Sequence, residues 1–220
     1  SLSRPRPGPD ELLVKVAACA VCRTDLHVVD GELPYPKLPI VPGHEIVGKV
    51  TRIGNEVKNH KIGDTVGVGC FVDSCGHCEN CEENEEQYCL NGATATYNSP
   101  SRFDKKVITF GGYSTHIVVK EDFVLKVSDK LPLNAVAPLL CAGITTYSPL
   151  KHWNVKSGDK VAVVGLGGLG HMAVKLASSM GAEVTMLSRS PEKEKDATDL
   201  GAAHFVLTTN PDEMKRINSS

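Results

Sequence analysis

The sequence lacks three features: a long hydrophobic run, a large net charge and an apolar leader. The most apolar stretch, residues 161–174, is too short to span a membrane and is interrupted by glycines and His171. The first residues, Ser1 to Pro5, contain no apolar signal core, and no initiator Met is present. A formal net charge of -2 gives no reason to expect a nucleic-acid partner. We therefore expect a cytoplasmic protein that binds neither membrane nor nucleic acid and whose true start is missing or was removed.

The chain has 220 residues, 41% hydrophobic and 23% charged, which is ordinary globular composition for one large domain or two small ones. It has eight cysteines, an even number that allows disulfides. Their clustering, and the absence of a secretion signal, favour metal binding instead. The cysteines are Cys19, Cys22, Cys70, Cys75, Cys78, Cys81, Cys89 and Cys141.

His44 and Glu45 follow an apolar, proline-rich approach and precede an expected strand over residues 46–53. An imidazole beside a carboxylate at the start of a strand is a typical fragment of a metal site. Cys22 lies before this pair and Cys141 far after it. Cys, His and Cys together form the ligand set of a catalytic zinc that keeps a fourth position open.

The surroundings of Cys22 are polar. Cys19 and Cys22 have the spacing of a zinc knuckle, but no second knuckle matches them, so one of the two is expected to be a bystander. Thr24, Asp25 and His27 place a hydroxyl, a carboxylate and an imidazole directly after Cys22. They fit either a polar turn after a strand or a proton relay beside a metal ligand.

The second cluster comprises Cys75, Cys78, Cys81 and Cys89, separated by two, two and seven residues. Four thiolates in a polar loop can fill all positions of a tetrahedral ion, which makes a closed, structural zinc site. A ferredoxin-type iron–sulfur site is the alternative. It requires its fourth cysteine sooner, followed by proline, so zinc is favoured.

The two parts of the chain have different strand patterns. Short strands separated by glycine turns predict a small, barrel-like β unit, and alternating strands and helices after residue 159 predict a doubly wound α/β unit. The expected strands are 11–18, 46–53, 65–68, a pair at 114–119 and 123–127, and then 160–164, 183–187 and 203–207. The expected helices are 134–140, one leading toward Trp153, one ending at Met180, 191–200 and one beginning at Pro211.

A glycine-rich turn joins the first strand of the α/β unit to its helix. Glycines there allow a tight turn and the close approach of a pyrophosphate to the helix N-terminus. The turn consists of Gly165, Leu166, Gly167, Gly168, Leu169 and Gly170. After the next strand come Ser188, Arg189 and Ser190. Proteins that bind a cofactor with a free ribose 2′-hydroxyl typically have an acidic residue at this place. This end suits a 2′-phosphate and hence NADP(H), unless Arg189 is only a surface cation.

These motifs resemble the zinc alcohol dehydrogenases of the medium-chain dehydrogenase/reductase superfamily, in particular the cinnamyl alcohol dehydrogenases and bacterial aldehyde reductases. The resemblance covers essentially the whole chain and rests on CRTDLH from Cys22, GHE from Gly43, CGHCENC from Cys75, LCAGIT from Leu140 and the glycine-rich turn. It implies a GroES-like β-barrel catalytic domain over residues 1–147 and the first half of a Rossmann domain over 148–220.

The resemblance also implies roles for individual residues. Cys22, His44 and Cys141 would hold the catalytic zinc, with Glu45 as an occasional ligand and Asp25 orienting His44. The four clustered cysteines would hold a structural zinc, and Cys19 and Cys70 match no ligand position. Further implied roles are proton relay for Thr24 and His27, contact with the cofactor pyrophosphate for Arg23 and contact with the nicotinamide for Thr145.

The expected activity is hydride transfer between NADP(H) and a primary alcohol or aldehyde, with two zinc ions per chain. A zinc polyol dehydrogenase is disfavoured by Cys141 and Ser188, where that group tends to have acids. The family continues beyond the point where this chain stops, after about three of six parallel strands. The alternative is therefore a truncated, catalytically inactive zinc-binding fragment, and a homodimer is expected only if the chain is complete.

Overall fold

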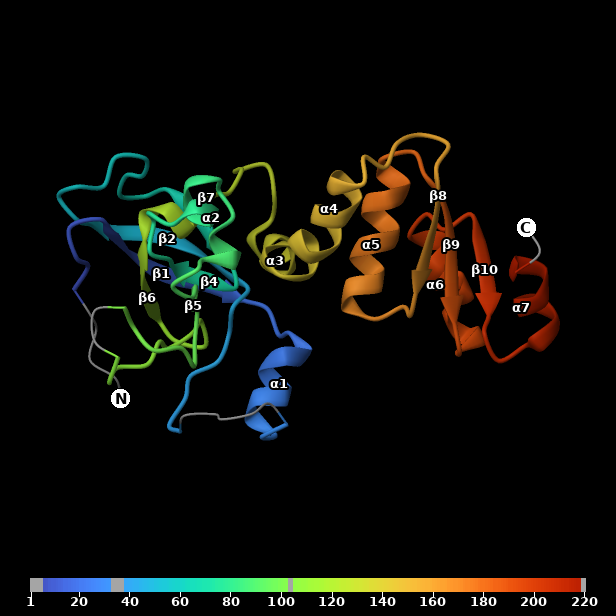
Figure 1. The fold of residues 1–220 in the computed structure, drawn as a ribbon, viewed down its shortest axis with the longest axis horizontal. Helices are drawn as coiled ribbons and strands as arrows, with labels where there is room; N and C mark the ends of the chain where they lie inside the picture. Colours follow the sequence, from blue (N-terminus) through green and yellow to red (C-terminus); the bar gives the residue numbers. More distant parts are fainter. Residues whose placement is uncertain (1–5, 33–37, 103–104, 219–220) are drawn as a thin grey trace. The chain divides into compact units, whose positions relative to one another are not determined.

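The computed structural model describes residues 6–32, 38–102 and 105–218. The chain divides into two compact units, Ser1–Cys141 and Ala142–Ser220 (Figure 1). The sequence-based boundary after residue 147 falls inside α4 (Ala142–His152), which belongs to the second unit. Within the described residues, no helix is both long and apolar enough to cross a membrane.

The first unit is built on a five-stranded antiparallel sheet in the order β6-β1-β2-β3-β7. Its strands are β1 (Glu11–Cys19), β2 (Ile46–Ile53), β3 (Thr65–Val68), β6 (His116–Lys120) and β7 (Val124–Lys126). Each expected strand of this unit is present. The expected pairing of the last two is wrong, because β6 pairs with β1 and β7 pairs with β3. Long-range partners, not the short connection between them, decide where these strands lie.

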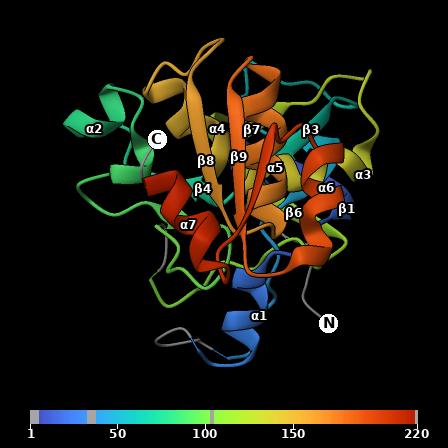
Figure 2. The same ribbon diagram turned by 90° about the vertical axis from the view of Figure 1, so that its right-hand side faces the viewer.

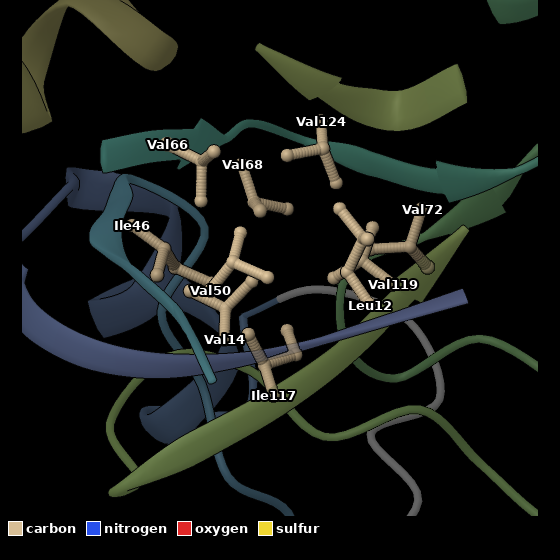
Figure 3. Packing of buried hydrophobic residues seen from close by; sticks show 10 residues of the cluster. All are labelled: Leu12, Val14, Ile46, Val50, Val66, Val68, Val72, Ile117, Val119 and Val124. Atoms are coloured by element: carbon tan, nitrogen blue, oxygen red, sulfur yellow. The ribbon is translucent and has the colours of Figure 1, made fainter. Parts of the chain in front are cut away.

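The core of this unit lies inside the curved sheet. Alternate residues of β1, such as Leu12 and Val14, have 0% exposure and meet Val66 and Val68 from β3. Figure 3 shows these side chains pointing toward one another, with Val72 and Val124 closing one side. β-branched residues dominate because they fit a pleated, half-buried surface. The predicted barrel-like unit is therefore confirmed, and its rigid sheet holds the loops that carry the cysteines and His44.

Short helices and strands lie in the connections before, between and after the strands of this sheet. They are α1 (Arg23–Val29), β4 (Phe71–Asp73), α2 (Glu79–Glu82), η1 (Glu86–Tyr88), β5 (Thr94–Ala95), η2 (Glu121–Phe123), α3 (Leu133–Val136) and η3 (Ala137–Leu140). The short helix expected over residues 134–140 is present as α3 followed by η3. α1 was not expected as a helix. It begins directly after Cys22, and the backbone N–H of Cys22 donates to Asp25 Oδ2 (3.0 Å) as in a capping box.

The second unit contains a three-stranded parallel sheet in the order β10-β9-β8, formed by β8 (Lys160–Val164), β9 (Glu183–Ser188) and β10 (His204–Leu207). Figure 2 shows the three strands side by side. The other elements are α4, α5 (Gly168–Ser179), η4 (Pro191–Lys193), α6 (Glu194–Asp199) and α7 (Pro211–Asn218). The predicted alternation of strand and helix is thus confirmed.

The two faces of β8 differ in burial. Val163 packs with Val174, Val184 and Met186 beneath α5. Val164, by contrast, is 79% exposed. Successive side chains of a strand point to opposite faces of the sheet, so Val164 lies on the face opposite Val163.

Candidate metal centres and nucleotide site

Three side chains distant in sequence converge in the first unit. Cys22 precedes α1, His44 lies two residues before β2, and Cys141 directly follows η3. Their ligand atoms all lie within 4.8 Å of one another, and the sulfurs of Cys22 and Cys141 are 4.0 Å apart. This spacing fits three ligands of one tetrahedral ion.

The Asp25 carboxylate hydrogen-bonds to the segments that carry Cys22 and His44. Its side chain is 2% exposed, and Oδ1 accepts hydrogen bonds from His44 Nδ1 (3.1 Å) and from the backbone N–H of Gly43 (3.1 Å). Oδ2 accepts from the backbone N–H of Cys22 (3.0 Å) and from the Tyr113 hydroxyl (2.8 Å). One buried carboxylate therefore fixes two of the three ligand-bearing segments.

The electrostatics of this network favour charge separation. Burial raises the pKa of Asp25, but hydrogen bonds from His44, Cys22 and Tyr113 outweigh burial and hold this pKa below its usual range. Burial lowers the pKa of His44, but Asp25 and Cys141 outweigh it and raise the pKa to about 11. Asp25 engages Nδ1, so Nε2 is the ring nitrogen left to bind a metal. The carboxylate of Asp25 and the thiol of Cys141 therefore favour positive charge at the His44 ring.

The two unassigned cysteines have different environments. Cys70 shares a hydrogen bond with Cys141, which lowers the pKa of Cys70 and raises that of Cys141. Cys19 packs beside the barrel core, and burial raises its pKa to about 11. Cys19 lies outside the ligand cluster, as expected for the bystander of the Cys19 and Cys22 pair.

The remaining residues expected around the catalytic cluster lie as follows. Glu45 is 3% exposed and is not part of the three-ligand cluster. Thr24 Oγ1 lies 3.6 Å from Cys22 Sγ. The His27 imidazole contacts the Glu32 carboxylate on the outer side of α1, and Arg23, the first residue of that helix, is exposed.

The second cluster gathers Cys75, Cys78, Cys81 and Cys89, with all ligand atoms within 4.8 Å of one another. Cys78 Sγ lies 3.5 Å from Cys81 Sγ and 4.0 Å from Cys89 Sγ. The backbone N–H of Cys75 donates to Cys89 Sγ (3.5 Å), and that of Leu90 donates to Cys78 Sγ (3.4 Å). Such N–H···S bonds stabilise thiolates. The backbone N–H of His77 and the Asn91 side chain lower the pKa of Cys75 to about 5.

The donor chemistry of both clusters fits zinc. Sulfur and imidazole are the ligands that zinc prefers, and the separations within each cluster suit tetrahedral geometry. Four sulfurs make the second site closed, whereas two sulfurs and one imidazole leave room for a further ligand at the first. The first is thus a candidate catalytic centre and the second a candidate structural one.

The glycine-rich turn of the second unit has the geometry of a phosphate-binding turn. Gly165 adopts a positive φ of 86°, and Gly167 caps the N-terminus of the twelve-residue helix α5. A Cβ on Gly167 or Gly168 would meet no atom within 4 Å, whereas a Cβ on Gly170 would lie 1.9 Å from the Gly165 carbonyl oxygen. Gly165 and Gly170 therefore serve the fold, and Gly167 and Gly168 leave open space at the helix N-terminus.

The residues expected to bind the ribose 2′-phosphate of the cofactor lie at the end of β9 and directly after it. Ser188 is buried, with its hydroxyl accepting from the backbone N–H of Ser190 (3.2 Å), and Arg189 is exposed. The structure adds Lys193, which sequence reasoning missed. Its Nζ donates to the Leu166 carbonyl (3.0 Å) and brings a cation to the glycine-rich turn. The sequence offered one signal for this residue: Lys193 is a cation that lies shortly after the end of β9, in η4. Thr145 is exposed on α4.

Comparison with known proteins agrees with this geometry. A family model described as "Alcohol dehydrogenase GroES-like domain" matches residues 8–129, and one described as "Zinc-binding dehydrogenase" matches residues 168–219. The chain is 51% identical over 221 residues to the NADP-dependent alcohol dehydrogenase C 1 of Mycolicibacterium smegmatis, covering 100% of this chain and 63% of that protein. It is 52% identical over 214 residues to aldehyde reductase YahK of Escherichia coli, covering 97% and 61% respectively.

Solved structures give the same picture. The CAD from Helicobacter pylori, complexed with NADP(H), superposes with a TM-score of 0.90 at 47% identity, over 94% of this chain and 59% of that one. The Sorghum bicolor cinnamyl alcohol dehydrogenase SbCAD4 superposes with a TM-score of 0.94 at 45% identity, over 98% of this chain and 61% of that one. The chain thus spans about three fifths of the length of these relatives.

The fold and the two cysteine clusters define a zinc-type dehydrogenase scaffold with a GroES-like unit and a partial Rossmann sheet. The chain belongs to the zinc-containing medium-chain alcohol dehydrogenases, in the branch of the cinnamyl alcohol dehydrogenases, aldehyde reductase YahK and the NADP-dependent alcohol dehydrogenases C. The family and fold predicted from the sequence are confirmed.

Proposed function

We propose that this chain carries the catalytic centre of an NADP(H)-dependent alcohol dehydrogenase that interconverts primary alcohols and aldehydes by hydride transfer. The observation that carries the proposal is the convergence of Cys22, His44 and Cys141 over the buried Asp25 carboxylate. The presence of all three side chains in one cluster, in a chain about half identical to an NADP-dependent alcohol dehydrogenase, supports a catalytic rather than a purely structural role.

Zinc bound at this centre supplies a Lewis acid for the carbonyl oxygen of the substrate. The chain's own residues hold and move the protons. Asp25 fixes the orientation of the His44 ring through Nδ1. The Thr24 hydroxyl, 3.6 Å from Cys22 Sγ, takes or gives the substrate proton. His27, in contact with Glu32 at the surface, passes that proton on to solvent.

The proposed cofactor contacts divide between three places. The glycine-rich turn at the start of α5 holds the pyrophosphate, and Ser188, Arg189 and Ser190 bind the 2′-phosphate, with Lys193 as an added cation. Arg23 adds a further charge toward the pyrophosphate, and Thr145 contacts the nicotinamide end. Because an acid at the end of β9 would select a free 2′-hydroxyl, its replacement by Ser188 supports NADP(H) over NAD(H).

The test combines metal analysis with turnover. The purified chain is expected to hold two zinc ions and to oxidise NADPH in the presence of an aldehyde. Cys22→Ser is expected to lose one of the two zinc ions and to lose turnover. The matched variant Cys19→Ser is expected to keep both zinc ions and its turnover. NADPH oxidation by a zinc-depleted Cys22→Ser variant would refute the proposal.

A second candidate is a zinc-binding fragment without activity. It is favoured by one observation, that the chain spans about three fifths of its relatives' length. It predicts two zinc ions per chain, with no NADPH oxidation for any aldehyde in a panel of aromatic and aliphatic compounds. The same assay therefore separates the two candidates.

A further inference from the structure

Arg102 lies beside the four-cysteine centre, although it belongs to a different segment. The described residues on either side of it are held by an isolated antiparallel bridge between Pro100 and Ile108 and by a hydrogen bond from Ser101 N–H to the Val107 carbonyl (2.9 Å). From there Arg102 Nη2 reaches Cys89 Sγ at 3.4 Å. A permanently charged group thus meets the last of the four sulfurs.

The same guanidinium fastens the loop that carries this sulfur. Nη2 donates to the Gly92 carbonyl and to the Asn91 carbonyl (3.4 Å), directly after Cys89. Its Nε is buried without a hydrogen-bond partner and lies 4.0 Å from Asp73 Oδ2, at the end of β4. The side chain is 23% exposed, so solvent screens only part of its charge. Arg102 therefore ties the cysteine loop to the barrel.

The electrostatic need for such a group follows from the donor set. Four thiolates around Zn²⁺ leave a net charge of about -2 on the site. The loop adds further negative charge through five acidic side chains: Glu79, Glu82, Glu83, Glu85 and Glu86. Asp73 does not cancel Arg102 fully, because it also faces Lys120 Nζ at 3.9 Å. The guanidinium is therefore the cation placed to offset charge at the Cys89 sulfur.

We propose that Arg102 is a positioning residue of the four-cysteine centre, which stabilises the Cys89 thiolate, holds the loop after it and slows the loss of zinc. The proposal rests on the assignment of zinc to this cluster. It concerns retention of the metal and the reactivity of one sulfur, not the hydride-transfer chemistry. Partners that hydrogen-bond metal ligands typically change metal affinity by about 10–100-fold.

The experiment measures zinc release from the whole chain into a chromophoric chelator. Arg102→Gln is expected to release one of the two zinc ions about 10–100-fold faster than the unsubstituted chain, and the other at an unchanged rate. Arg102→Lys keeps the positive charge but lacks the planar guanidinium. Its rate of zinc release is expected to lie between those of the unsubstituted chain and of Arg102→Gln. Arg52→Gln, which removes an exposed arginine from β2, serves as the matched control and is expected to change neither rate.

A second measurement separates charge compensation from a general loosening of the loop. Alkylation by iodoacetamide, mapped by mass spectrometry, is expected to accelerate at Cys89 more than at Cys75 in Arg102→Gln. Equal acceleration at all four cysteines, faster loss of both zinc ions, or release as fast in Arg102→Lys as in Arg102→Gln would each overturn the proposal. An unsubstituted chain without zinc in this cluster refutes the zinc assignment itself, whereas normal zinc content with unchanged release in Arg102→Gln refutes only the role of Arg102.

Discussion

His44 Nδ1 lies 3.1 Å from Oδ1 of Asp25, a residue nineteen positions earlier in the chain. The same carboxylate accepts the backbone N–H groups of Cys22 and Gly43. The start of α1 and the approach to β2 are thus held by one buried anion. The geometry of two candidate metal ligands therefore depends on a residue outside the three-residue cluster.

Replacing Asp25 by Asn tests this dependence. The amide keeps the size of the side chain but removes the charge that orients and polarises His44. We expect the affinity of the catalytic centre for zinc to fall by about 10–100-fold, with the four-cysteine centre unchanged. Chelator competition that resolves the two zinc ions measures both values.

Tyr113→Phe is expected to weaken zinc binding at the catalytic centre less than Asp25→Asn does. It removes only the hydroxyl that donates to Asp25 Oδ2 (2.8 Å) and keeps the ring. Its effect on catalytic zinc affinity is expected to be at most about tenfold. A Tyr113→Phe loss larger than that of Asp25→Asn would contradict a network centred on the carboxylate.

Removing the structural metal is expected to destabilise the first unit and spare the catalytic centre. Cys81 is 7% exposed within the four-cysteine loop, so Cys81→Ser opens a closed site. We expect the loss of one zinc and a fall of more than about 5 °C in the melting temperature of this unit. Zinc analysis and calorimetry check this, with Gln87→Ala, an exposed residue of the same loop, as the control. Unchanged thermal stability after loss of that zinc would show that the loop does not need it.

Much of this architecture can be predicted from local pattern. β2, β3 and β8 begin and end where strand propensity and glycine turns indicate. The candidate metal ligands can be predicted because cysteine and histidine are rare enough for their spacing to be informative. α1 was missed because Thr24, Val28 and Val29 have low helix propensity, and the capping contact from Cys22 to Asp25 outweighs it.

The remaining features depend on tertiary contacts with no local signal. Tyr113 meets Asp25 across 88 positions, and Arg102 meets Cys89 from a separate segment. Lys193 reaches Leu166 across 27 positions. No periodicity marks such pairs, because their proximity is set by how the strands and loops pack. Sequence reasoning thus predicted the side chains that the structure gathers into two clusters, but not most of the groups that hold them in place.

Two cations, Lys193 beside the glycine-rich turn and Arg189 directly after β9, are expected to set cofactor preference. Arg189→Ala and Lys193→Ala should each weaken NADPH binding by about tenfold or more and leave NADH binding unchanged, since only NADPH carries the 2′-phosphate. Lys195→Ala is the matched control, because Lys195 pairs with Asp199 within α6. Titration of cofactor fluorescence gives the constants. Equal losses for NADPH and NADH would assign these residues to the pyrophosphate or to the fold instead.

The glycine-rich turn allows folding and binding to be separated within one motif. A Cβ on Gly170 would lie 1.9 Å from the Gly165 carbonyl oxygen, so Gly170→Ala must push α5 away from the turn after β8. We expect the second unit to lose about 2 kcal/mol or more, seen in calorimetry and in faster hydrogen exchange of β8 and α5. Gly168→Ala meets open space and adds a better helix former, so its stability is expected to be unchanged or raised by up to about 1 kcal/mol. If the open space at Gly168 is where a pyrophosphate approaches, the same methyl group weakens NADPH binding in a correctly folded unit. Tight NADPH binding by Gly168→Ala would therefore place the pyrophosphate elsewhere.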